Sequence, residues 1–328
     1  MTVVTRQAWL ESMPWIDRDD ADIDGYVRQL DEDPGFDLRS ALERWRRDGV
    51  VVFENAIEPA CLDAFEADLH ELQSHPDAYD LTVEVRGSRH MPIGEVDRAE
   101  LSSPGVKFNH MHTVSGHAMR LSLHRAVSGF LRHVFRHPAC VTQSLTFYKG
   151  SQQPIHIDYP YVRTQTHLAH LAASWIPLED IHAESGPLAY YPGSHRVDVS
   201  GFFDWGGGSI LYEKDSGRTP MDFAHYLWDR MREQGLSPRV FLPRRGDVLV
   251  WHGNLAHEGT RIGDDRRTRR SYVTHYTSLD AYPERLRYPD ALAAHRYVTS
   301  DGGYAFDLPW REGARVLPSY AALRAKTS

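Results

Sequence analysis

The stretch Gln153-Pro154-Ile155-His156-Ile157-Asp158-Tyr159 carries two polar side chains from which the rest of the sequence can be interpreted. Successive side chains on a β-strand point to opposite faces, so we expect His156 and Asp158 to share one face. An imidazole and a carboxylate side by side are two of the three ligands in a 2-His-1-carboxylate iron site. The pattern alone is weak, because about one His-x-Asp is expected by chance in a chain with 19 histidines.

Other histidine pairs in the chain are weaker candidates. The sequence His75-Pro76-Asp77 follows a charged helical stretch, and its proline argues against a central strand, so we expect a surface loop. The pair in His110-Met111-His112 has no third ligand nearby, which favours a loop or a pocket wall. His167 and His170 would share a face only on a helix, whereas the surrounding residues indicate a strand.

The pattern of elements changes along the chain from helices to strands. Asp37 is a candidate N-cap for a helix that ends at Gly49, and Pro59 opens another. Further helical periodicity covers 120–135 and 219–234. Short runs of β-forming residues, separated by turn residues, predict strands at 50–53, 141–148, 167–177, 188–191, 239–242, 246–252 and 269–276. Helices followed by short strands predict a mainly β protein with flanking helices, built on a jelly-roll, cupin-like core.

We predict a single domain over residues 1–328, divided into three parts. Residues 1–36 are acidic and irregular, which indicates a poorly ordered or loosely docked N-terminal arm. Residues 37–276 form the helix-wrapped jelly-roll core, with an insertion at 197–240 whose glycines 206–208 indicate a loop. Residues 277–328 form a C-terminal extension with little periodicity.

The composition narrows the classes of protein. Hydrophobic residues make up 41% and charged residues 25% of 328 residues, as in ordinary globular proteins. A net charge of −8 argues against a nucleic-acid partner, and the sequence has no apolar run that would place it in a membrane. The two cysteines, Cys61 and Cys140, cannot form a disulfide framework that would stabilise a fold of this size. These observations predict a cytoplasmic protein without a nucleic-acid or membrane partner, and they leave its oligomeric state open.

Several motifs together resemble the phytanoyl-CoA dioxygenase (PhyH) family, from about Leu38 to Tyr276. They are the His156-Ile-Asp158 segment, the strand ending near His257 and the strand containing Arg269. The resemblance also includes the segments 48–53, 173–180, 185–188, 192–196 and 246–252. It implies a double-stranded β-helix that carries Fe(II) and uses 2-oxoglutarate and O₂ as co-substrates.

The resemblance implies a role for specific residues. The iron ligands would be His156, Asp158 and His257, although His252 lies five residues before His257 and is the alternative third ligand. Arg269 would bind the distal carboxylate of 2-oxoglutarate, and a slip of one residue would select Arg270 instead. The other residues implied at the co-substrate are Trp175, Thr260 and Leu145, and the candidates for substrate contact are Tyr159, Tyr161 and Arg163.

The resemblance implies an oxygenase that hydroxylates or otherwise oxidises a small metabolite and releases succinate and CO₂. Halogenating relatives carry Gly or Ala at the position of Asp158, so its carboxylate indicates hydroxylation or a related oxidation. Two alternatives remain: a cupin-type metal enzyme without redox chemistry, and a non-catalytic binding module. Arg269 argues against the first, and a complete ligand set argues against the second.

Overall fold

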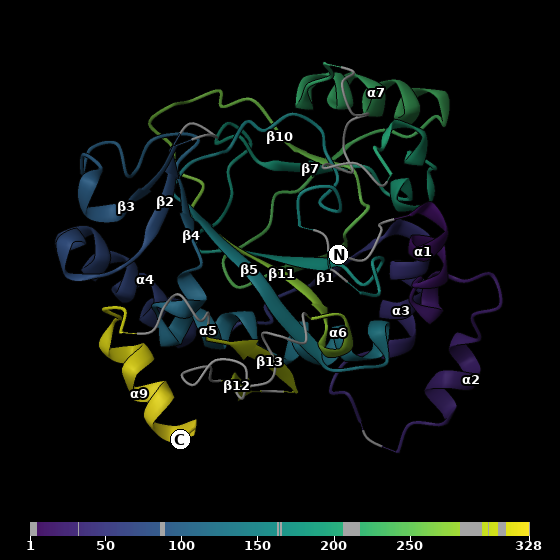
Figure 1. Cartoon of the computed structure of the whole chain (residues 1–328), viewed down its shortest axis with the longest axis horizontal. Coiled ribbons are helices and arrows are strands. Elements are labelled where there is room, and N and C mark those ends of the chain that lie inside the picture. Colours follow the sequence, from purple (N-terminus) through teal and green to yellow (C-terminus); the bar gives the residue numbers. More distant parts are fainter. Residues whose placement is uncertain are drawn as a thin grey trace.

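The structure, a computed structural model, describes residues 5–31, 33–85, 89–162, 164, 166–205, 217–282, 297–300, 302–307 and 313–327. Two features singled out in the sequence, Arg163 and the glycines at 206–208, lie outside these residues. Within them, two mainly antiparallel sheets face each other and helices flank the larger one (Figure 1). This confirms the predicted mainly β, jelly-roll fold class.

The larger sheet contains the strands that surround the site. Its strand order is β1-β9-β6-β11-β5-β4-β2-β3. The smaller sheet has the order β10-β7-β8, and residue His156 joins it through an isolated bridge to His257 of β10. The bounds of these strands are β1 Val50–Phe53, β2 Thr82–Val85, β3 Arg89–Pro92, β4 Lys107–Asn109, β5 Ala139–Phe147, β6 Ala172–Pro177, β7 Leu188–Tyr190, β8 Arg239–Val240, β9 Val248–His252, β10 His257–Gly259 and β11 Ser271–Ser278.

Helices cover the outer face of the larger sheet, and their ends follow the capping signals in the sequence. The Asp37 side chain accepts a hydrogen bond from the Ser40 amide at the start of α3 (Leu38–Asp48). The helix ends at Gly49, whose φ of 72° is in the left-handed region that glycine tolerates. Helix α4 (Pro59–Ser74) starts with the predicted proline. Helix α7 (Pro220–Glu233), which lies near the smaller sheet instead (Figure 1), has a capping box from Thr219.

The helix predicted at 120–135 is two helices, α5 (Gly116–Ser122) and α6 (Arg125–Phe135). The chain breaks between them because the His124 side chain caps the start of α6 by accepting from the Ala126 amide. The predicted periodicity survives the break, since Leu121, Val127 and Leu131 are all buried. Apolar spacing therefore identified the buried face without revealing the break.

The N-terminal arm is firmly packed, contrary to the expectation of loose docking. It contains α1 (Arg6–Glu11) and α2 (Ile23–Arg28), drawn in purple in Figure 1. Ile16 and Ile23 are buried in the same hydrophobic cluster as α3 and α6. The Asp17 carboxylate lies 3.3 Å from His252 Nε2 at the end of β9. Buried apolar contacts therefore hold the arm against the barrel.

The C-terminal extension is also ordered where it is described. Strands β12 (Tyr297–Ser300) and β13 (Gly303–Phe306) form a hairpin, and β13 pairs in parallel with the start of β5. Helix α9 (Pro318–Thr327), yellow in Figure 1, packs beside α5. No helix in the described ranges is long and apolar enough to cross a membrane.

The alternation of side chains along β11 separates the helix-packed core from the barrel interior. Tyr272 and Tyr276 belong to the cluster beneath the helices. Val273 belongs to the cluster inside the barrel, and both Val273 and His275 line its cavity. The site therefore occupies the inner face of the larger sheet, where the smaller sheet closes over it.

Candidate metal centre and cavity

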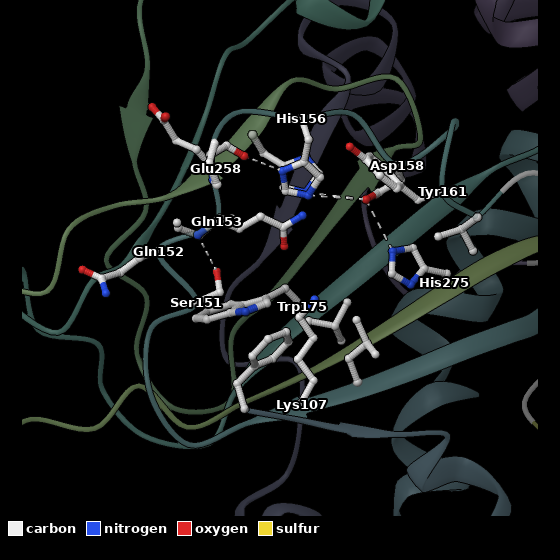
Figure 2. A pocket seen from close by; sticks show the side chains of 18 of the residues that line it. Lys107, Ser151, Gln152, Gln153, His156, Asp158, Tyr161, Trp175, Glu258 and His275 are labelled. Carbon is white, nitrogen blue, oxygen red and sulfur yellow. Dashed lines mark hydrogen bonds and ion pairs between the residues drawn. The ribbon is translucent and has the colours of Figure 1, made fainter. Parts of the chain in front are cut away.

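A cavity of about 640 Å³ opens inside the barrel and contains the histidine and carboxylate selected from the sequence (Figure 2). Strands of both sheets supply its walls, and the segment 151–162 crosses it. His156 is not on a regular strand as predicted, because its segment forms only an isolated bridge. Backbone hydrogen bonds of 2.9 Å in both directions between His156 and His257 nevertheless hold the two residues opposite each other.

Three side chains converge in this cavity. Asp158 Oδ1 lies 4.0 Å from His156 Nε2 and 3.6 Å from His257 Nε2. The three ligand atoms lie within 4.8 Å of one another, and no other group of acidic, histidine or cysteine side chains in the described ranges meets this criterion. His257 belongs to this group and His252 does not. Of the two histidines considered as the third ligand, His257 is therefore the one that lies beside Asp158.

The backbone orients both imidazoles for metal binding. His156 Nδ1 is 2.9 Å from the Pro154 carbonyl, and His257 Nδ1 is 2.9 Å from the Leu255 carbonyl. A carbonyl can only accept, so each Nδ1 carries the proton and each Nε2 keeps a lone pair directed at Asp158. Burial, followed by the nearby His257, lowers the pKa of His156 to about 3 and keeps its ring neutral. The donor set fits a divalent transition metal.

The Asp158 carboxylate is buried and has two neighbours on the larger sheet. Its Oδ2 accepts a 2.8 Å hydrogen bond from the Trp251 indole Nε1–H. Its Oδ1 lies 3.5 Å from His275 Nε2. Burial alone would raise the pKa of the carboxyl, but the interactions with His257, His275 and His156 outweigh it and hold the pKa of Asp158 below its usual range. The ionised form, which binds a cation, is therefore favoured.

A second charged group, Arg269, lies in the wall of the same cavity. Arg269 is 3% exposed, and among the described residues its side chain donates a single hydrogen bond, 3.3 Å long, from Nη1 to the Gly186 carbonyl. The rings of Phe147 and Trp175 lie 5.6 and 5.7 Å from the guanidinium carbon. Burial lowers the pKa of Arg269 to about 10, so it stays charged at neutral pH. No carboxylate within the described part of the chain neutralises this cation, which suits an acidic ligand.

The neighbouring arginine points the other way. Arg270 forms ion pairs with Glu66 at 2.5 Å and Glu179 at 3.3 Å, on the helix side of the sheet. Regular strand pairing begins only at Ser271, two residues later than predicted, yet Arg269 keeps the inward alternation of β11. The geometry therefore places Arg269, and not Arg270, at the cavity.

The remaining predicted residues divide between the cavity and its surroundings. Trp175, Leu145 and Tyr161 line the cavity, and Tyr161 is 48% exposed at its mouth. Tyr159 does not line it, because its ring packs against Trp9 and Phe203 on the other side of the chain. This placement argues against the prediction of a substrate contact.

Thr260 also lies outside the cavity lining. Its hydroxyl donates a 2.9 Å hydrogen bond to the Pro187 carbonyl, so it is already engaged between β7 and the residues after β10. The adjacent residue, Gly259, lines the cavity in its place. The predicted contact of Thr260 with the co-substrate is therefore not supported by its position.

The other histidine pairs lie away from the centre. His252 contacts Asp17 of the arm, on the opposite face of β9 from Trp251. His112 hydrogen-bonds Ser144 at 2.7 Å beneath the sheet. His167 and His170 lie in a turn before β6, not on a strand, and their ring centroids are 5.2 Å apart. The segment 75–77 forms the expected surface connection, as a short 3₁₀ helix at Pro76–Ala78.

Two residues beside Asp158 were not selected from the sequence. His275 falls in the predicted strand 269–276 and Trp251 in the predicted strand 246–252, but no motif in the sequence assigns either residue a function. The Trp251 indole nevertheless faces Asp158. The available signal was the alternation itself, since every second residue from Arg269 to His275 points into the barrel.

Jelly-roll barrels with a 2-His-1-carboxylate group are the scaffold of non-heme iron oxygenases, and the protein is an oxygenase of this class. The chain belongs to the phytanoyl-CoA dioxygenase (PhyH) family, which it matches over residues 45–270. It is 23% identical over 276 residues to a phytanoyl-CoA dioxygenase domain-containing protein 1 homolog of Caenorhabditis elegans. That match covers 73% of this chain and 90% of the relative.

Solved structures confirm the fold. EctD from S. alaskensis with bound Fe matches with a TM-score of 0.55 at 17% identity, covering 77% of this chain and 80% of that one. The epimerase SnoN in complex with Fe³⁺, alpha ketoglutarate and nogalamycin RO matches with a TM-score of 0.54 at 16% identity, covering 83% and 98%. At these identities the likeness shows the architecture alone.

Proposed function

We propose that the protein is an Fe(II)- and 2-oxoglutarate-dependent oxygenase that hydroxylates, or otherwise oxidises, a small molecule. One observation carries the proposal: a convergent His156, Asp158 and His257 group shares a cavity with a buried Arg269 that has no carboxylate partner in the described ranges. A non-redox cupin enzyme or a binding module would need the metal group but gives no reason for the buried cation.

The side chains of this cavity would have two separate roles, metal binding and 2-oxoglutarate binding. The Nε2 atoms of His156 and His257 and the Asp158 carboxylate would hold the ion. A ferrous ion there supplies the O₂ chemistry that couples decarboxylation of 2-oxoglutarate to succinate and CO₂ with oxidation of the substrate. Arg269 would hold the distal carboxylate of 2-oxoglutarate by a charge-assisted hydrogen bond in a desolvated wall.

Apolar side chains would keep water away from the co-substrate. Trp175, Phe147, Leu145 and Val273 line the cavity on the larger sheet around Arg269. A guanidinium surrounded by such groups attracts a carboxylate more strongly than one in water, because the local dielectric is low. We therefore assign Trp175 and Leu145 to the walls of the 2-oxoglutarate site.

The substrate would enter where the cavity lining is polar. Ser151, Gln152, Gln153, Tyr161 and Glu258 line the same cavity as the metal group (Figure 2). A volume of about 640 Å³ suits a metabolite-sized molecule together with the co-substrate. We infer a substrate with hydrogen-bonding groups, for which Tyr161 is the candidate contact.

The test combines binding and turnover. Metal-free protein reconstituted with Co(II), which does not turn over, should bind 2-oxoglutarate in calorimetry, and His257→Ala should not. Protein reconstituted with Fe(II) should then release succinate in a screen of polar metabolites, and release should require 2-oxoglutarate. Absence of 2-oxoglutarate binding to the Co(II) protein would refute the proposal and favour the non-redox alternative.

A further inference from the structure

The Asp158 carboxylate has an additional neighbour that the metal group does not include. His275, on β11, lines the cavity and places its Nε2 3.5 Å from Asp158 Oδ1. Figure 2 shows His156 and His275 approaching the carboxylate from different sides. Because His275 is outside the set of atoms that lie within 4.8 Å of one another, it is not positioned to share the ion as a fourth ligand.

The backbone is irregular where His275 enters the cavity. The pairing of β11 with β5 shifts register between His275 and Tyr276, so that Thr142 is bypassed. The bypassed Thr142 hydroxyl donates a 3.1 Å hydrogen bond to the His275 carbonyl. The pairing of β11 with β6 on the other side continues without a break. A bulge of this kind changes the local twist and redirects side chains, and bulges are frequent beside active sites.

The His275 ring is buried although one of its two nitrogens forms no hydrogen bond with the described residues. His275 is 4% exposed, and its Nδ1 is buried without a hydrogen-bond partner in the part of the chain that the structure describes. Buried polar atoms are usually paired, so an unpaired one in a site calls for a functional reason. The contact between the other ring nitrogen, Nε2, and Asp158 provides such a reason.

The two oxygens of Asp158 are therefore held differently. Trp251 donates to Oδ2 at 2.8 Å, which turns that oxygen away from the two ligand histidines. Oδ1 faces His156, His257 and His275. A carboxylate whose two oxygens are held by different groups is restrained from rotating, so it would present one oxygen, Oδ1, to an ion bound by the two histidines.

We infer that His275 is a positioning residue: its Nε2–H donates to Asp158 Oδ1 and, together with Trp251, holds the carboxylate as a one-oxygen metal ligand. The inference rests on the proposed function for the identity of the ligand set. It adds a residue on β11 to a site otherwise built from the 156–158 segment, β9 and β10. Loss of such an outer hydrogen bond typically weakens metal binding by about 10- to 100-fold.

The experiment measures Co(II) binding to the metal-free protein, and the absorption spectrum of the bound ion, in five variants. His275→Leu removes the donor and keeps an apolar filler, whereas His275→Gln keeps an N–H. Trp251→Phe removes the other donor and keeps an aromatic ring. His170→Leu removes a buried histidine that hydrogen-bonds Ser278 away from the cavity, and His257→Ala removes a ligand. Circular dichroism and melting of the metal-free proteins monitor folding.

We expect His275→Leu and Trp251→Phe to weaken Co(II) affinity by about 10- to 100-fold and to alter the spectrum. His275→Gln should recover most of the affinity, and His170→Leu should leave it unchanged. Wild-type affinity and spectrum in His275→Leu would overturn the inference, as would equal losses in the Leu and Gln variants. A complete loss like that of His257→Ala would make His275 a ligand, which also overturns it.

The outcomes separate this inference from the proposed function. If the wild-type protein binds Co(II) and the His275 variants behave alike, only the inference fails. If the variants behave as expected but 2-oxoglutarate does not bind, the proposed function fails and the positioning of Asp158 stands. If the wild-type protein binds no divalent metal, both fail.

Discussion

Single side chains decide which of the candidate histidines can bind metal. His257 and His252 are five residues apart, but they lie on opposite sides of the barrel wall because the chain turns between β9 and β10. His257 faces Asp158, and His252 faces Asp17 of the N-terminal arm. Periodicity could not separate them, since the turn at Gly253 and Asn254 breaks the alternation that a continuous strand would have.

The two histidines should therefore give different phenotypes. His257→Ala should abolish binding of a divalent metal and all turnover, because two of three ligands cannot hold the ion. His252→Ala should bind metal but lose about 1–3 kcal/mol of unfolding free energy through its contacts with Asp17 and Trp45. Metal titration and urea unfolding of both variants provide the measurement. Exchange of the two phenotypes would show that the third ligand is misassigned.

The adjacent arginines offer a second matched pair. Arg269→Ala should raise the apparent KM for 2-oxoglutarate about thirty- to thousandfold, because a desolvated charged hydrogen bond contributes roughly 2–4 kcal/mol. Arg270→Ala should change that KM little, since its guanidinium pairs with Glu66 and Glu179 outside the cavity. Steady-state titration of 2-oxoglutarate with both variants distinguishes them, and a large effect confined to Arg270 would contradict the structure.

At the scale of elements, sequence periodicity predicted α3, α4, α7 and the strands β1, β5 to β9 and β11. It predicted neither β2 to β4 nor how the ends of the elements are built. The caps at Asp37, Gly49 and Pro59 were recognisable because each residue type has a specific physical role at a helix end. The break at His124 was not, since a histidine side chain as a cap is unusual. The bulge in β5 also left no local signal, because it depends on how two distant strands pair.

The contact between α5 and α9 depends on a single glycine. A Cβ at Gly116 would overlap the backbone carbonyl of Ser319, whereas a Cβ at Gly129 on α6 would meet nothing within 4 Å. We expect Gly116→Ala to destabilise the protein by separating the two helices. Gly129→Ala should stabilise it by about 0.5–1 kcal/mol, because alanine restricts the unfolded chain. Chemical unfolding of both variants measures the difference, and a neutral Gly116→Ala would show that α9 is not docked as described.

At the scale of the whole molecule, buried histidines link stability to pH. Burial lowers the pKa of His170 to about 4 and that of His195 to about 3, and His156 behaves similarly without metal. In the unfolded chain a histidine titrates near 6.5. Below that pH the unfolded chain binds protons that the folded protein does not. The contribution of these histidines to the free energy of unfolding is therefore fully present above about pH 6.5 and decreases as the pH falls toward 4.

The expected loss is on the order of 2 kcal/mol per buried histidine between pH 7.5 and pH 5. His170→Gln, which can still hydrogen-bond Ser278, should remove one such contribution and flatten the dependence. Urea unfolding of the protein, freed of metal by a chelator, at a series of pH values measures how the free energy of unfolding changes with pH. A slope that is identical in the variant and the native protein would show that His170 does not titrate between the two states.

The sequence also left the two ends of the chain without a role. Apolar residues in 1–36 and 277–328 follow little regular periodicity, yet Ile16, Ile23, Leu317 and Tyr320 are buried in the main cluster. Such contacts come from segments distant in the chain, and a single sequence does not reveal them. The family match ends at Arg270, so the resemblance could not supply them either.

The parallel pairing of β13 with β5 has a consequence for solubility. Strand β4 covers β5 at Leu145 and Thr146, and β13 covers it at Ala139 and Cys140. A chain cut after Ser278 would retain β11 but expose backbone N–H and C=O groups at the start of β5, ready to pair with another molecule. Light scattering should detect self-association of that truncated chain at concentrations where the full chain stays monodisperse. The C-terminal hairpin would then prevent the exposed edge of one barrel from pairing with a strand of another copy.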